Sequence, residues 1–153
     1  MTPDEALKDV ITSIFVRKEG RGVQTRLFED WDEPTRTYLL KTLKLGTSEM
    51  VVLAVLKSAS VSFVVTTRRV VWIKNTQIIE WPHAQIKNVE PVTDNRVDWS
   101  SYTELKDFDR LPRVSQLQIN ANTGECGVVD VEPGKARVAV QSILNHIAVR
   151  SRN

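Results

Sequence analysis

Two adjacent arginines are the residues whose type and spacing most directly suggest chemistry. Arg68 and Arg69 follow two threonines and lie between two apolar runs, in the stretch FVVTTRRVVWIKN. Guanidinium and ammonium groups donate charge-assisted hydrogen bonds to phosphate and carboxylate oxygens. A candidate anion site therefore comprises Arg68, Arg69, Lys74 and Lys57. A solvated turn between two strands explains the same residues, and we favour the turn because Lys74 falls at the far end of the second strand.

Other residues capable of catalysis or metal binding are few. His83 and His146 lie in different predicted elements and have no acidic or cysteine partner evident in the sequence. Cys126 is the only cysteine, so an intramolecular disulfide is impossible, and in a predicted strand it is typical of a small buried residue. The segment Gly20-Arg21-Gly22 lacks the third glycine and the preceding strand of a dinucleotide-binding loop. We expect no enzyme activity, no metal site and no cofactor.

Two of the four tryptophans are candidate interface residues. Trp31 and Trp99 lie in the polar stretches FEDWDE and RVDWSS, and tryptophan is enriched at binding hot spots. Trp99 belongs to the charged segment 94–113. That segment is either a passive solvated insert, which we favour, or a partner-binding loop carried by a rigid scaffold.

Composition limits the class of protein. The 153 residues are 41% hydrophobic and 26% charged, which suits one globular domain with a helical extension. The 21 basic and 19 acidic residues give a net charge of +2, and this balance argues against a nucleic-acid binder. The N-terminus carries acids where a secretory signal would be basic, and no apolar run approaches the roughly 20 residues of a transmembrane helix. We therefore expect a cytoplasmic protein without a transmembrane segment.

Helical patterns are expected near both ends of the chain. Thr2 and Glu5 form a capping box before an apolar stripe, which predicts a first helix. Asp32 is a suitable N-cap for a second helix that ends before Gly46. A third helix starts near Pro133, and its apolar stripe comprises Ala136, Val140, Ile143, Leu144 and Ile147. We place a boundary that separates an N-terminal helical extension, 1–46, from a β-rich domain with a C-terminal helix, 47–153.

The middle of the chain has the character of β-structure. The runs EMVVLAVL, SVSFVVTT and RRVVWI are rich in valine and separated by short polar connections, which predicts an antiparallel meander. Further candidate strands are TQIIEW, QIKNVEPV, SYTELKDF, SQLQINA and CGVVDV, together with a short strand near 23–28. The connection 122–125, Asn-Thr-Gly-Glu, has the composition of a hairpin turn.

The order of these features resembles the bacterial pleckstrin-homology-like (PH-like) domains, including the YokE-like group and the related GRAM domains. The similarity lies in VVTTRRVVWI, in IIEWPHAQIKNVEPV and in the helix ARVAVQSILNHI, and it covers roughly two-thirds of the chain. The two predicted N-terminal helices and the charged insert depart from the family pattern. The resemblance implies an α+β fold: an antiparallel, partly open β-barrel of about seven strands, capped by the C-terminal helix.

The resemblance also implies a non-catalytic interaction module. Such a module binds a protein partner, as a hetero- or homo-oligomer. The alternative is binding to an anionic lipid surface, because PH-like relatives that bind phosphoinositides grip phosphates with basic residues of an early hairpin. The basic-x-arginine-x-aromatic spacing of those relatives is absent here.

Overall fold

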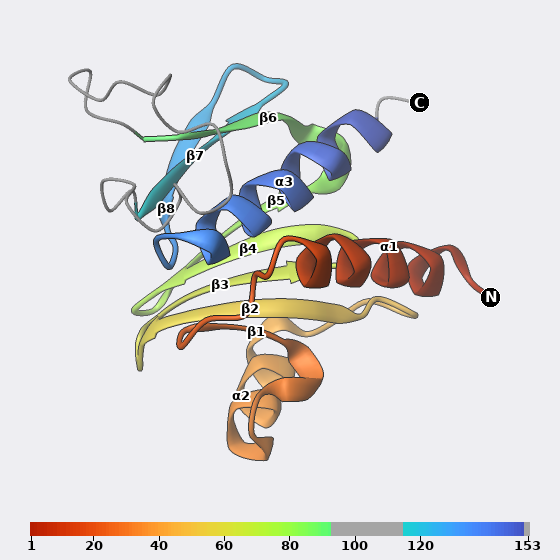
Figure 1. Ribbon diagram of the computed structural model, residues 1–153, viewed down its shortest axis with the longest axis vertical. Coiled ribbons are helices and arrows are strands. Elements are labelled where there is room, and N and C mark those ends of the chain that lie inside the picture. The colour runs from red at the N-terminus through yellow and green to blue at the C-terminus, as the bar shows by residue number, and fades with distance from the viewer. Residues whose placement is uncertain (93–114, 152–153) are drawn as a thin grey trace.

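The computed structural model describes residues 1–92 and 115–151, which form an α+β fold (Figure 1). Two short 3₁₀ helices, η1 and η2, span Phe28–Asp30 and His83–Gln85. The three α-helices of the described residues are α1 (Pro3–Arg17), α2 (Glu33–Leu43) and α3 (Lys135–Arg150). The strands are β1 (Thr25–Leu27), β2 (Val51–Ser58), β3 (Val61–Thr66), β4 (Arg69–Lys74), β5 (Gln77–Pro82), β6 (Ile86–Pro91), β7 (Gln116–Ala121) and β8 (Cys126–Asp130).

The described strands form two antiparallel sheets, which corrects the expectation of one bent, barrel-like sheet. Strands β1 to β5 make a five-stranded sheet in chain order, and β6 to β8 make a three-stranded sheet. The break falls where Pro82, which has no amide hydrogen, is followed by η2. The sheets approach each other at Trp81, whose ring would lie 2.6 Å from a Cβ added to Gly127. The absence of that Cβ permits the close contact.

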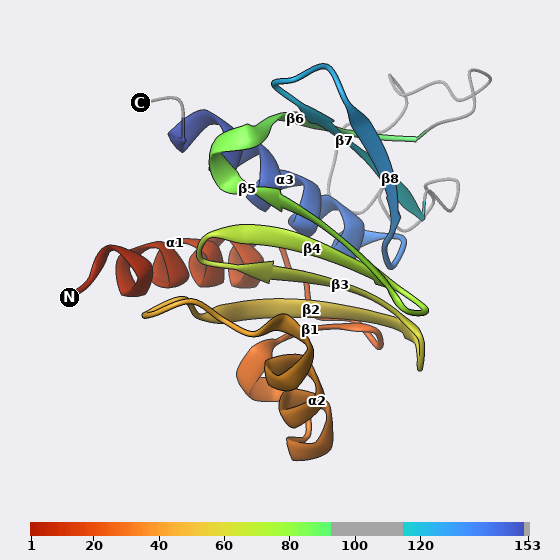
Figure 2. The same ribbon diagram turned by 180° about the vertical axis from the view of Figure 1, so that it is seen from behind.

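Both faces of the five-stranded sheet are covered by helices. On one face, α2 buries Leu39 and Leu43 against Val64 and Val71. On the other face lie α1 and α3, as Figures 1 and 2 show from opposite sides. Strands buried on both faces have continuous apolar runs, whereas strands with one wet face alternate. The two coverings therefore explain why valines occupy consecutive positions in β2, β3 and β4.

The main core joins both ends of the chain. The α1 side chains Leu7, Ile11, Ile14 and Phe15 lie in one buried cluster with the inner residues of β2 to β4 and with the α3 stripe. The predicted burial of that stripe is confirmed, since its residues Val140, Ile143, Leu144 and Ile147 are at most 1% exposed. The boundary at residue 46 stays a prediction. The helices before it pack into cores that they share with the strands after it.

Local sequence signals set the ends of several elements. The capping box of α1 is present, because Thr2 accepts from the Glu5 amide and Glu5 accepts from the Thr2 amide. Asp32 caps α2 through the Thr35 amide. In the β7–β8 hairpin, Gly124 has a φ of 92°, a conformation that favours glycine. Trp99, the candidate strand SYTELKDF and the segment 94–113 lie outside the described residues.

Candidate functional site

The Thr-Thr-Arg-Arg segment forms the turn between β3 and β4, with its own internal hydrogen bonds. The Thr66 hydroxyl accepts from the amides of Arg68 and Arg69, at 3.1 and 3.0 Å, and donates to Glu49 at 2.6 Å. Thr67 Oγ1 accepts from the Met50 amide at 3.0 Å. Both threonines therefore tie this turn to the segment that leads into β2.

Arg69 reaches the face of the sheet that α2 covers. Its Nε donates to Glu49 at 2.9 Å, and its two terminal nitrogens donate to Glu80 at 2.5 Å and to the Leu43 carbonyl at 2.6 Å. Leu43 is the last residue of α2, so the guanidinium fastens the C-terminal end of that helix to β5. The side chains of Arg69 and Glu49 are 18% and 4% exposed. Each of the three guanidinium nitrogens of Arg69 therefore donates a hydrogen bond within the protein.

Burial and hydrogen bonding act in opposite directions on Glu49. Burial acts to raise the pKa of this carboxyl, but hydrogen bonds from Thr66, the Gly46 amide and Arg69, together with the Arg69 charge, hold the pKa below its ordinary value. Glu49 is therefore a buried carboxylate that depends on its donors to remain charged.

Arg68 reaches the opposite side of the sheet. Its Nε and one terminal nitrogen donate to the two oxygens of Asp4, at 3.2 and 3.1 Å. Asp4 lies in the first turn of α1, and its pKa is lowered chiefly by the hydrogen bond from Arg68 and by a second from Thr67. The two adjacent arginines thus attach the two N-terminal helices to one hairpin, one helix on each side.

The two lysines of the candidate anion site lie at the other end of the hairpin. Lys74 is the last residue of β4 and pairs with Val61 at the start of β3. Lys57 is near the end of β2, and its Nζ donates to the Val131 carbonyl at 3.2 Å. Because the six residues of β3 are separated by five steps of about 3.3 Å, roughly 17 Å of strand separates the lysine end from the arginine turn. The structure therefore divides the four predicted residues into two distant pairs.

Trp31, the candidate interface residue within the described chain, is occupied by internal contacts. Its Nε1 donates to the Ala54 carbonyl at 3.2 Å, and the Arg26 guanidinium lies 4.8 Å from its ring centroid. The ring packs against the cluster beneath α2. The expectation that Cys126 is buried is wrong, because Cys126 is exposed at the first position of β8, at the hairpin end of the strand.

A cavity of about 270 Å³ lies where the N-terminal end of α1 meets the C-terminal end of α3. Asp4 and Leu7 line it from α1, Ile147 and Arg150 from α3, and His83 from η2. His83 is 7% exposed, and within the described residues its Nε2 has no hydrogen-bond partner. Burial lowers the pKa of His83 to about 4, against the opposing effects of backbone hydrogen bonds with Thr66 and Arg69 and of the Glu49 charge. The imidazole is therefore neutral at pH 7.

Strand β5 presents an apolar edge. It is the terminal strand of the five-stranded sheet, and residues 77–80 are all exposed. Ile78 and Ile79 are 49% and 47% exposed. Successive side chains of a strand point to opposite faces, so Ile78 and Ile79 are exposed on opposite faces of the sheet.

Comparisons with protein-family models, with curated proteins and with solved structures found no match. None of the described helices is long and apolar enough to span a bilayer. Across residues 1–92 and 115–151, no group of three or more histidine, cysteine or acidic side chains is placed to hold a metal ion. The geometry of the described residues is accordingly the basis for a functional proposal.

Proposed function

We propose that the protein is a non-catalytic, PH-like interaction module that binds protein by pairing along strand β5. The exposed edge with Ile78 and Ile79 is the observation that carries this proposal. An unpaired edge offers a row of backbone donors and acceptors to another strand, and natural edge strands usually carry charges or prolines that discourage such pairing. The first three residues of β5 carry neither, and the charge and the proline of this strand, Glu80 and Pro82, follow them.

The order of the elements supports a PH-like fold. A meander of β2 to β5 precedes the three-stranded sheet of β6 to β8, and α3 follows with its apolar stripe buried in the core between them. This order agrees with the family that the sequence resembles. The N-terminal helices are an addition, since α1 and α2 cover opposite faces of the meander (Figure 1).

A second copy of the chain fits the β5 edge. In symmetric antiparallel pairing the two-fold axis passes between two copies of the same residue, because residues directly opposite each other share a face of the sheet. With the axis between the two copies of Ile78, each Ile78 lies opposite the other. The same register places Gln77 opposite Ile79 of the second copy. Self-association therefore satisfies the exposed backbone and covers both isoleucines without any other partner.

Sedimentation velocity should show a concentration-dependent monomer–dimer equilibrium that Ile78→Glu weakens. Placing carboxylates at the seam between two copies introduces like-charge repulsion and removes apolar contact, so we expect the dimer Kd to rise at least about tenfold. The experiment needs a reducing agent, because the exposed Cys126 could otherwise cross-link copies.

Val128→Glu is the matched control, because Val128 is an exposed apolar residue of β8, a strand at the edge of the other sheet. The dimer Kd should be unchanged in this variant. A chain that remains monomeric at roughly 0.5 mM would contradict self-association. A dimer that Val128→Glu disrupts and Ile78→Glu does not would place the interface on the three-stranded sheet, which would contradict pairing along β5.

The lipid-surface alternative predicts binding to anionic vesicles. Arg68 and Arg69 are poor residues for testing it, because both already bind groups of this chain, the Asp4 carboxylate and the Leu43 carbonyl. Lys74 is exposed and, within the described residues, makes no hydrogen bond or ion pair with a helix, so Lys74→Glu is the cleaner variant. In co-sedimentation with phosphatidylserine vesicles at low salt we expect no binding of the wild type. Salt-sensitive binding that Lys74→Glu abolishes would favour the lipid function instead.

A further inference from the structure

The cavity between α1 and α3 has features of a small-molecule site that are independent of the β5 edge. Its volume of about 270 Å³ is close to the lower limit of the range of small-ligand pockets. Three of its walls come from segments far apart in the sequence: the first turns of α1, η2 and the last turn of α3. Segments from three parts of the chain therefore meet at this hollow.

One polar group of the cavity, Nε2 of His83, has no hydrogen-bond partner among the described residues. A neutral imidazole has one nitrogen that donates and one that accepts. In the tautomer with its hydrogen on Nδ1, the buried Nε2 is the acceptor. The site therefore requires a ligand, or a water, that donates a hydrogen bond.

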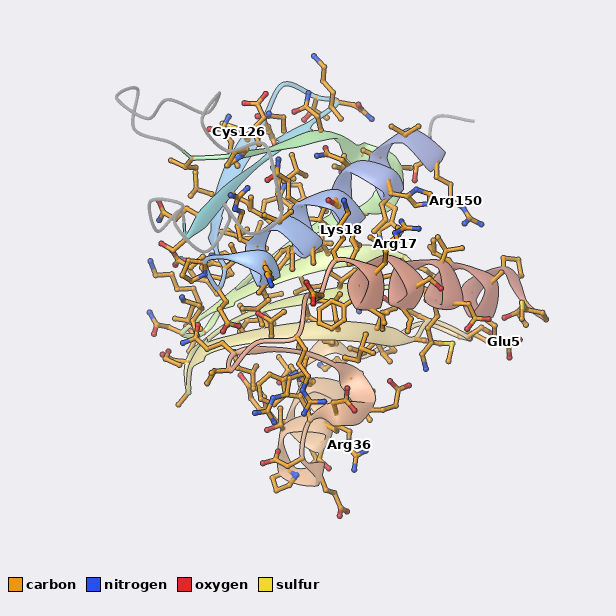
Figure 3. All side chains as sticks on the ribbon, viewed as in Figure 1. Glu5, Arg17, Lys18, Arg36, Cys126 and Arg150 are labelled. Atoms are coloured by element: carbon orange, nitrogen blue, oxygen red, sulfur yellow. The ribbon has the colours of Figure 1, made fainter. Side chains whose placement is uncertain are left out.

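Charges of both signs line the same cavity. Asp4 is a carboxylate held in place by Arg68, and Arg150 is an exposed cation at the C-terminal end of α3 (Figure 3). Among the described residues, no hydrogen bond or ion pair engages Arg150. The apolar part of the wall comprises Pro3, Leu7 and Ile147. A matching ligand carries a cationic donor, a carboxylate and a small apolar group.

We infer that this cavity binds a free α-amino acid with an apolar side chain. The ligand ammonium group donates to Asp4 and to Nε2 of His83, and the ligand carboxylate accepts from the Arg150 guanidinium. The apolar side chain lies against Leu7 and Ile147. A simple anion supplies no donor to Nε2 of His83, and a simple cation supplies no acceptor to Arg150. The zwitterion satisfies both ends of the site.

Titration calorimetry with L-leucine tests this inference. We expect saturable binding with a Kd of about 1 mM or tighter, a range that nine non-hydrogen atoms can supply. Isocaproate, which lacks the ammonium group, and isoamylamine, which lacks the carboxylate, should each bind at least about tenfold more weakly, because each loses one charge-assisted contact. Leucine should also shift the ¹⁵N resonance of His83 Nε2.

Arg150→Gln should weaken leucine binding at least about tenfold without unfolding the chain, because the side chain is exposed. Arg36→Gln is the control, since Arg36 lies on α2 across the five-stranded sheet (Figure 3). Three results would overturn the inference: no saturable binding at roughly 20 mM leucine, equal affinity in Arg150→Gln, or isocaproate binding as tightly as leucine. None of these measurements depends on the oligomeric state that tests the β5 proposal.

Discussion

An Arg69→Ala variant should lose about 3 kcal/mol of unfolding free energy, the largest loss that we expect from one side chain of the hairpin. Removing one partner of a mostly buried ion pair leaves the other charge without compensation, which typically costs about 3–5 kcal/mol. The charge left without a partner is that of Glu49, whose side chain is 4% exposed. The Leu43 carbonyl at the end of α2 also loses its donor. In a chain of this size the melting temperature should fall by roughly 6–12 °C.

Arg68→Ala is the matched control, because it removes the same side chain from the adjacent residue. Arg68 and Asp4 form a pair at the protein surface, and pairs of that kind contribute little. Urea unfolding of both variants measures the difference directly. Equal losses would contradict the proposed role of burial. A double-mutant cycle of Arg69→Ala with Glu49→Gln should show coupling, because the two side chains share a hydrogen bond.

Acidification from pH 7 to pH 5 should remove about 2 kcal/mol of stability through His83 alone. The pKa of His83 is about 4 in the folded chain and near 6.5 when the chain is unfolded. Between those values the unfolded chain holds a proton that the folded chain does not, so stability falls as the pH falls through this window. Below about pH 3, where both the folded and the unfolded chain hold the proton, this residue contributes no further loss. The separate loss from Glu49, whose folded pKa is depressed, begins only below about pH 4.5.

Guanidinium unfolding at several pH values measures this dependence. His83→Gln should flatten the profile between pH 7 and pH 5. If His83→Gln does not fold, an NMR titration of the wild-type imidazole gives the same answer. A folded pKa near 6.5 for His83 would refute the argument, because a buried neutral ring cannot titrate there.

Elements with local signals could be predicted from the sequence. The capping box at Thr2 and Glu5 predicted α1, and Asp32 predicted α2. The meander and the 122–125 hairpin follow from valine runs and turn residues, which act over a few positions. The apolar stripe of the last helix predicted its burial correctly.

Features that depend on contacts between distant residues could not be predicted. Arg68 binds Asp4, 64 positions earlier, and Arg69 binds Leu43 of a helix on the other face. No periodicity in a single sequence pairs such residues. The burial of His83 depends on packing between α1, η2 and α3, so its isolation in the sequence gave no sign of a cavity. One signal was present: consecutive valines in β2 to β4 indicate strands buried on both faces, which a barrel with a wet exterior does not explain.

The double covering of the five-stranded sheet has a consequence for how the chain avoids aggregation. Its valine-rich strands are the kind of segment that joins other chains when left bare during synthesis. Two of the covering helices, α1 on one face and α2 on the other, come from the first 43 residues, and α3 follows the strands. The two N-terminal helices are therefore made first. They leave the ribosome before any of the valine-rich strands do, so each emerging strand meets a covering surface that already belongs to its own chain.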